Sequence, residues 1–106
     1  MGNNLNKPLK VGATIGIIGG GQLGRMLVMS GKKMGFQMIV LDPTLNSPAG
    51  QVADRQIVAA FDQISALTEL AELCDVITYE FENIEVASLE KAIPLEKLPQ
   101  GTELLK

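Results

Sequence analysis

The chain has 106 residues, of which 46% are hydrophobic and 20% are charged, a composition that suits one globular domain with a single core. Its formal net charge of −3, without a basic cluster, argues against nucleic-acid binding that depends on phosphate neutralisation. A single cysteine and no histidine exclude a disulfide framework and a zinc cluster. The sequence has no apolar run of about 18 residues and no signal-peptide pattern, so we expect a cytoplasmic protein without a membrane segment.

A strand, a glycine turn and a helix are predicted near the start of the chain, after an extended or disordered segment at residues 1–12. The strand is the apolar run Thr14–Ile18, and the helical pattern starts at Leu23. Between them stand the residues Gly-Gly-Gly-Gln-Leu-Gly, numbered 19–24. A strand that passes through glycines into a helix leaves backbone N–H groups unpaired at the positive end of the helix dipole. The sequence therefore predicts an anion site at this turn.

Each glycine of the turn has a separate expected use. Gly19 suits a tight turn, Gly21 lets a ligand or a neighbouring backbone approach, and Gly24 permits close packing of the helix on the strand. The plainer interpretation is that these glycines only let the chain turn and pack. A Walker loop is excluded, because Arg25-Met26 stands where lysine and serine or threonine are needed.

The first helix is predicted from an apolar stripe at helical spacing and from a glycine that ends it, Gly35. The stripe consists of Leu23, Met26, Leu27 and Met34.

A second strand is predicted at residues 37–41, and it ends at Asp42-Pro43. Asp42 has two interpretations: it holds a ribose, as in dinucleotide-binding proteins, or it initiates the Asp-Pro turn, which is the favoured one. Arg25 also has two interpretations: it is a phosphate ligand or a surface charge, and the surface charge is the favoured one. Residues 44–54 form a turn-rich connection that is either functional or a simple surface loop.

The second half of the chain continues the alternation of strands and helices. A third strand is predicted at residues 57–60, followed by a helix that Asp62 would cap. Its apolar positions are Leu67, Leu70, Ala71 and Cys74, and Cys74 is expected in the core. A fourth strand at Val76–Tyr79 runs into Glu80-Phe81-Glu82-Asn83. A last helical stretch carries Val86, Leu89 and Ile93, and residues 94–106 are expected to begin a linker.

This pattern predicts an α/β fold with three layers, α/β/α, around a parallel sheet of about four strands in the order 3-2-1-4. The winding direction then changes between strands 1 and 4, where ligands bind in such folds. The glycine turn and the acidic pair Glu80 and Glu82 both reach this point. A carboxylate there could accept hydrogen bonds from ribose hydroxyls or a ring amine while the helix end holds phosphate. The alternative is a solvated acidic pair without a role.

Four segments, at residues 14–26, 40–43, 47–54 and 75–83, closely resemble the N-terminal domain of the N5-carboxyaminoimidazole ribonucleotide synthases. The resemblance covers residues 12–93, and the joint presence of Gly-Gly-Gly-Gln-Leu-Gly and Tyr-Glu-Phe-Glu-Asn makes it specific. These enzymes belong to the ATP-grasp superfamily. They are also known as the ATPase subunits of phosphoribosylaminoimidazole carboxylase, and they act in purine biosynthesis.

The resemblance implies a Rossmann-like pre-ATP-grasp domain at residues 13–93 of an ATP-dependent carboxylating ligase. In that reaction ATP and bicarbonate give carboxyphosphate, which carboxylates the exocyclic amine of 5-aminoimidazole ribonucleotide. Gln22, Leu23 and Glu80 are implied as substrate contacts, with Gly21 and Glu82 beside them. ATP and Mg²⁺ would bind outside this chain, in a cytoplasmic homodimer. The chain itself would carry no catalytic residue and no metal ligand, and we expect it to be inactive alone.

Two other classes of function remain open at this point. A stand-alone nucleotide-binding module of the NAD or regulatory type is supported by the glycine spacing and by Asp42. A noncatalytic interaction domain would expose surface that other domains bury.

Overall fold

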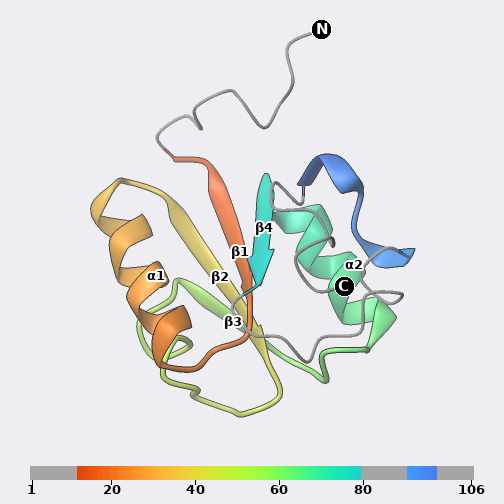
Figure 1. Ribbon diagram of the computed structural model, residues 1–106, viewed down its shortest axis with the longest axis horizontal. Coiled ribbons are helices and arrows are strands. Elements are labelled where there is room, and N and C mark those ends of the chain that lie inside the picture. Colours follow the sequence, from red (N-terminus) through yellow and green to blue (C-terminus); the bar gives the residue numbers. More distant parts are fainter. Residues whose placement is uncertain (1–11, 80–90, 98–106) are drawn as a thin grey trace, which may run out of the picture.

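A computed structural model describes residues 12–79 and 91–97 of the chain, in which a helix follows the first strand and another follows the third, while a loop joins the second strand to the third (Figure 1). The elements are β1 (Thr14–Ile18), α1 (Gln22–Lys33), β2 (Gln37–Asp42), β3 (Arg55–Val58), α2 (Ile64–Leu73), β4 (Val76–Tyr79) and the short 3₁₀ helix η2 (Leu95–Lys97). The first and fourth strands have the predicted bounds, and β2 is one residue longer than predicted.

The four strands form one sheet in the order β3-β2-β1-β4, and all neighbouring strands are parallel. The predicted order is confirmed. In this register Ile18 of β1 lies between Leu41 of β2 and Tyr79 of β4. The carboxyl ends of these three strands therefore lie at one edge of the sheet, which is where the glycine turn begins.

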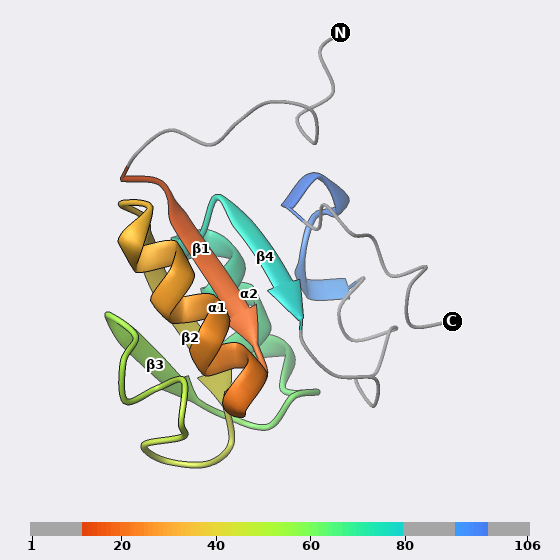
Figure 2. The ribbon, with the colours of Figure 1, turned by 60° about the vertical axis from the view of Figure 1, so that its left-hand side comes forward.

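Helices cover both faces of the sheet, with α1 on one face and α2 on the other (Figure 2). Successive side chains of a strand point to opposite faces, so Ile17 and Val40 pack on the α1 side while Ile18 and Leu41 pack on the α2 side. These four side chains are fully buried. Burial on both faces explains why the strands read as continuous apolar runs, and the three-layer arrangement is confirmed.

The apolar stripe that predicted α1 does not form its buried face. The buried residues of the helix are Gly24, Val28 and Gly31, and the stripe is exposed. The exposed fractions are 52% for Leu23, 63% for Met26, 38% for Leu27 and 64% for Met34. The reason is that two glycines let the helix backbone approach the sheet, and the thioether of Met38 fills the space beside Gly31. A face of large side chains could not pack this closely.

Two predicted boundaries in the middle of the chain are wrong by one or two residues. β3 begins at Arg55 rather than at residue 57, because it starts opposite Ile39 and pairs with β2 up to Asp42. Arg55 is tolerated at this edge of the sheet because it pairs with Glu69 of α2 at 2.8 Å. The N-cap of α2 is Gln63, not Asp62, and it makes no side-chain capping bond.

The end of the described chain packs against α2 and β4. Ile93 is 2% exposed and belongs to the same core cluster as Cys74, whose predicted core position is confirmed. In η2, Lys97 donates a hydrogen bond from Nζ to the backbone oxygen of Ala71. Val86 and Leu89 of the predicted last helix lie outside the described residues. Neither α1 nor α2 is long and apolar enough to cross a bilayer, and the described ranges hold no other candidate.

Candidate functional site

The site predicted at the change of winding direction lies where β1 and β4 end. Ile18 and Tyr79, the last residues of these strands, are register partners in neighbouring parallel strands. The glycine turn therefore leaves the sheet beside the point at which the chain continues from Tyr79 to Glu80. Glu80 and Glu82 lie outside the described residues, so their contribution to the site stays a prediction.

The glycine turn joins β1 to α1 with the geometry that the sequence predicts. Gly19 has a φ of +107°, a backbone conformation that residues with a side chain rarely adopt. Its N–H donates to the backbone oxygen of Leu41 at 2.9 Å. Gly21 is the N-cap of α1 and provides no side-chain cap, and the first turn of the helix has no acidic residue. The positive end of the helix dipole is thus uncompensated by this turn's own side chains.

Gln22 and Leu23, the first two residues of α1, are both exposed. Leu23 retains 52% of its accessible surface. Their side chains are consequently available to a ligand at the helix end. An anion held by first-turn N–H groups and an organic group against the Leu23 side chain would fit together here.

Asp42 connects the end of β2 to the glycine turn. Its Oδ2 accepts the N–H of Gly20 at 2.7 Å, and its Oδ1 accepts the N–H of Thr44 at 2.8 Å. The second bond is the turn-initiating contact favoured from the sequence. The first was missed, because nothing local in the sequence indicates a contact across 22 positions. With both oxygens bonded to backbone, this carboxylate is poorly placed to hold a ribose.

The connection between β2 and β3 folds back onto the glycine turn. The N–H of Ala49 donates to the oxygen of Gly20 at 2.9 Å. Ser47 is 1% exposed, and its side chain occupies the space that a Cβ on Gly20 would need. Its Oγ accepts the N–H of Gly50 at 3.1 Å. The loop is therefore packed against the candidate site and is more than a surface connection.

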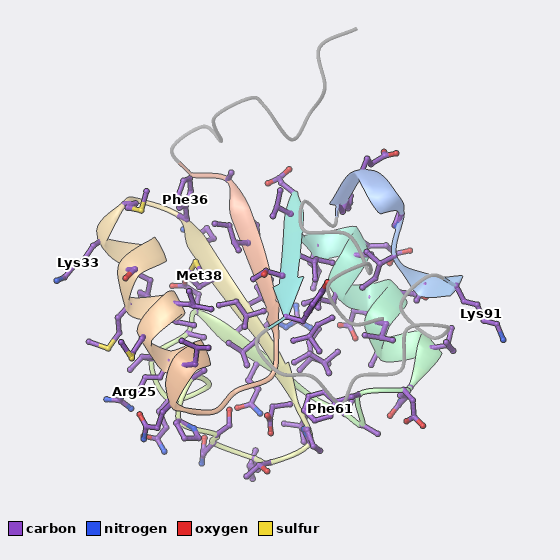
Figure 3. All side chains as sticks on the ribbon, in the orientation of Figure 1. Arg25, Lys33, Phe36, Met38, Phe61 and Lys91 are labelled. Carbon is purple, nitrogen blue, oxygen red and sulfur yellow. The ribbon has the colours of Figure 1, made fainter. Side chains whose placement is uncertain are left out.

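Arg25 fastens α1 to the same loop (Figure 3). Its Nη1 donates to the oxygen of Pro48 at 3.3 Å and to Oε1 of Gln51 at 3.4 Å. Neither sequence interpretation anticipated this, since Arg25 bonds to protein groups. The available signal was a long turn-rich loop after β2, with carbonyl groups that need donors.

Two titratable groups near the carboxyl end of α2 and at the end of β4 are neutral at ordinary pH. Burial raises the pKa of the Cys74 thiol from 9.0 to about 12, with a smaller raising effect from Asp75 and a lowering effect from Lys97. Burial likewise raises the pKa of Tyr79. A protonated thiol is a poor nucleophile, so Cys74 is structural. Among residues 12–79 and 91–97, no group of three carboxylate or cysteine side chains could hold a metal ion.

An open cleft of about 580 Å³ lies elsewhere, between the second half of α1 and residues 51–53. Lys32 lines this cleft. Its Nζ donates a hydrogen bond to the backbone oxygen of Val52 at 3.1 Å and lies 3.7 Å from Oδ1 of Asp54. Gly21, Gln22 and Leu23, the predicted site residues that the structure describes, do not line this cleft.

The family model of the ribonucleotide synthetase preATP-grasp domain matches residues 12–100 of this chain. The N5-carboxyaminoimidazole ribonucleotide synthase of Brucella melitensis is 60% identical over 83 residues, which cover 78% of this chain and 23% of that protein. The Bacillus subtilis synthase is 53% identical over 94 residues, covering 89% of this chain and 25% of that protein.

Solved structures give the same result. An ADP complex of an N5-carboxyaminoimidazole ribonucleotide synthetase superposes with a TM-score of 0.86 at 53% identity, covering 94% of this chain and 26% of that one. The Aspergillus clavatus synthase, in complex with ADP and 5-aminoimidazole ribonucleotide, has a TM-score of 0.72 at 38% identity. The match covers 83% of this chain and 24% of that one. This chain thus spans about a quarter of the length of the relatives it matches.

Proposed function

Because this chain belongs to the ribonucleotide synthetase preATP-grasp family, we propose that it contributes the 5-aminoimidazole ribonucleotide site of an ATP-dependent carboxylating ligase. The reaction joins bicarbonate to the exocyclic amine of that nucleotide, in purine biosynthesis. The observation that carries the proposal is the pairing of Ile18 with Tyr79. It brings the glycine turn and the start of Tyr-Glu-Phe-Glu-Asn, the two motifs that identify the synthases, to one edge of the sheet.

The nucleotide phosphate is assigned to the amino end of α1. The N-cap of the helix makes no side-chain capping bond and its first turn carries no acidic residue, so the first-turn N–H groups are assigned to the phosphate. Gly21 permits the close approach of the phosphate, and the exposed amide of Gln22 supplies a further donor. The exposed side chain of Leu23 offers an apolar contact.

Glu80 is assigned to the ribose or the exocyclic amine. A carboxylate accepts hydrogen bonds from both groups, and Glu80 directly follows the strand residue that pairs with the end of β1. Glu82 is two positions further and is assigned a weaker contact with the same nucleotide. The relative from Aspergillus clavatus was solved with 5-aminoimidazole ribonucleotide bound, which supports this nucleotide as the ligand.

The NAD-type module is the less favoured reading of the same site. Dinucleotide-binding folds use an acidic residue after the second strand to hold a ribose. Asp42 stands at that place, but both of its oxygens accept backbone N–H groups. The geometry therefore supports a mononucleotide held between β1 and β4.

ATP and Mg²⁺ are proposed to bind outside these 106 residues. The support is that relatives about four times as long include structures with bound ADP. When bound, ATP with its Mg²⁺ supplies the activated form of bicarbonate. A cytoplasmic homodimer is proposed for the whole enzyme, and the chain alone is proposed to lack ligase activity.

The test is a titration of the purified chain with 5-aminoimidazole ribonucleotide, followed by amide NMR shifts, with NAD and ATP as parallel ligands. We expect saturable shifts at Gln22, Leu23 and Glu80 with 5-aminoimidazole ribonucleotide alone. Saturable shifts with NAD instead would support the dinucleotide module. No response to 5-aminoimidazole ribonucleotide at millimolar concentration would count against a half-site in this chain.

Variants sharpen the assignment of single residues. Gln22→Ala and Glu80→Gln should each weaken binding about tenfold, the effect of losing one hydrogen bond to a charged or polar group. Gln37→Ala is the matched control, because this exposed residue lies at the opposite end of β2. Equal weakening by Gln37→Ala would mean that the loss is not local to the site.

A further inference from the structure

The backbone of Gly20 is held on both sides, by the last residue of β2 and by the segment that follows this strand. Its N–H donates to Oδ2 of Asp42 at 2.7 Å, and its oxygen accepts the N–H of Ala49 at 2.9 Å. Neither partner belongs to β1 or α1, the elements that the glycine turn connects. The position of the turn is therefore set by groups far away in the sequence, in addition to its own helix and strand.

The two carboxylate oxygens of Asp42 accept hydrogen bonds from two different parts of the backbone. One carboxylate oxygen holds Gly20, and the other holds the N–H of Thr44 at 2.8 Å, the first bond of the following loop. Hydrogen bonds from N–H groups to an ionised carboxylate are about twice as strong as neutral ones. A single side chain thus couples the start of the loop to the glycine turn.

Packing reinforces these hydrogen bonds. A Cβ on Gly20 would collide with the Ser47 side chain and would lie 3.1 Å from Cβ of Asp42. Ser47 is 1% exposed and is itself fixed by the N–H of Gly50, which donates to its Oγ at 3.1 Å. The glycine turn has no room to move toward the loop.

We propose that Asp42 is a positioning residue, which together with Ser47 and Ala49 holds the glycine turn in the geometry that binds a nucleotide phosphate. A turn that is fixed before binding loses little conformational freedom when the ligand arrives, so affinity rises. The identity of the ligand rests on the proposed function, whereas the fixing of the turn does not. The carboxylate that dinucleotide binders offer to a ribose is used here to build the turn.

The chain offers a matched control for the loss of such a bond. Asp75 accepts the N–H of Thr14 through Oδ2 at 2.8 Å, the same kind of contact at the opposite end of β1. Asp42→Asn and Asp75→Asn each replace one carboxylate that accepts a backbone N–H. A merely structural role for Asp42 predicts similar consequences for both variants.

The first measurement uses the ligand-free chain of 106 residues. Hydrogen–deuterium exchange and amide shifts are recorded for Gly20, Gln22 and Leu23 in the wild type and both variants, beside melting temperatures. We expect exchange at Gly20 to accelerate about tenfold or more in Asp42→Asn, the loss of a charge-assisted hydrogen bond, with shifts at Gln22 and Leu23. Asp75→Asn should change none of the three. Equal behaviour of the two variants at these amides would overturn the proposal.

The second measurement is the dissociation constant for 5-aminoimidazole ribonucleotide. We expect Asp42→Asn to weaken it about tenfold, and Asp75→Asn to leave it unchanged. If the wild type binds but Asp42→Asn binds equally well, the positioning role is wrong. If the wild type does not bind, the proposed function fails, and the exchange data alone decide whether Asp42 fixes the turn.

A second variant covers the case in which Asp42→Asn does not fold. Ser47→Ala keeps the bond between Asp42 and Gly20 but removes the acceptor for Gly50, which loosens the loop. We expect several-fold faster exchange at Ala49, whose N–H joins the loop to the oxygen of Gly20, and unchanged exchange at Thr14. Unchanged exchange at Ala49 would overturn the part assigned to the loop.

Discussion

The carbonyl oxygen of Gly19 lies 2.5 Å from the position that a Cβ on Gly24 would occupy. This oxygen belongs to the backbone of the turn, which is fixed by the bond from the N–H of Gly19 to Leu41. Gly31 lies further along the same buried face of α1, and its nearest neighbour is the flexible thioether of Met38. Both glycines lie on the buried face of α1, but the surroundings of Gly31 can accommodate a side chain more easily than those of Gly24.

Gly24→Ala should therefore destabilise the chain more than Gly31→Ala. Both changes gain up to about 1 kcal/mol of helix propensity, and overpacking costs about 1–3 kcal/mol or more where the neighbour cannot yield. We expect a net loss of roughly 2 kcal/mol for Gly24→Ala and less than about 1 kcal/mol for Gly31→Ala, where the Met38 side chain can adjust. Urea denaturation measures both values. A larger loss for Gly31→Ala would contradict the close approach seen at Gly24.

The outward direction of the apolar stripe on α1 gives a second prediction. Met26 is 63% exposed, whereas Val28 is fully buried on the opposite face of the helix. Met26→Gln should change the free energy of unfolding by less than about 0.5 kcal/mol, and Val28→Ala should cost roughly 2 kcal/mol through lost burial and a cavity. Thermal and urea denaturation of the two variants compare the faces directly. The reverse ranking would mean that the stripe is buried after all.

Cys74 should be unreactive while the chain is folded. Cys74 is 2% exposed, and burial raises the pKa of its thiol to about 12, so almost no thiolate is present at pH 8. We expect the native chain to react with a thiol reagent at pH 8 far more slowly than the same chain in urea. Fast labelling of the native protein, at the rate of the unfolded control, would contradict the buried position.

The same pKa shift predicts the alkaline limb of the stability curve. In the unfolded chain the thiol loses its proton near its ordinary value of 9.0, whereas in the folded chain it keeps the proton up to about 12. Between these values the folded state binds more protons, so stability falls as pH rises. Cys74→Ala removes this contribution, and urea midpoints at pH 8 and pH 10 should then differ less than in the wild type. An unchanged difference would exclude Cys74 as the source.

Arg25 should act on the loop more than on global stability. Removing its bonds to Pro48 and Gln51 frees a polar carbonyl near the surface, a loss of roughly 0.5–1.5 kcal/mol. We expect Arg25→Ala to accelerate amide exchange and proteolysis at residues 48–51, with a small change in melting temperature. Lys91→Ala, which removes one exposed positive charge on the side of the domain away from Arg25 (Figure 3), is the control and should leave the loop unchanged. Equal acceleration of exchange and proteolysis at residues 48–51 in both variants would show that the loss of a positive charge, and not the loss of the Arg25 hydrogen bonds, is the cause.

Much of the fold could be predicted because its signals are local. Apolar runs identified β1 and β4 with their observed bounds, Gly35 was identified as the stop of α1 and has a φ of +93°, and the alternation of elements implied the strand order. The errors at β3 and α2 are of one or two residues. They arise where pairing with a neighbouring strand or a short turn, and not the side-chain pattern, sets the boundary.

For the candidate site, the amino-acid order was enough to locate the glycine turn and to pair it with the segment after β4, because right-handed crossovers leave few arrangements for these strands. Three features were decided only in the folded chain. These are the face of α1 that is buried, the double use of Asp42, and the loop that closes over Gly20. Each depends on contacts between residues distant in sequence. Helical periodicity finds a stripe but cannot tell that two glycines on the other side allow closer packing, and a carboxylate has no partner until folding brings a backbone N–H to it.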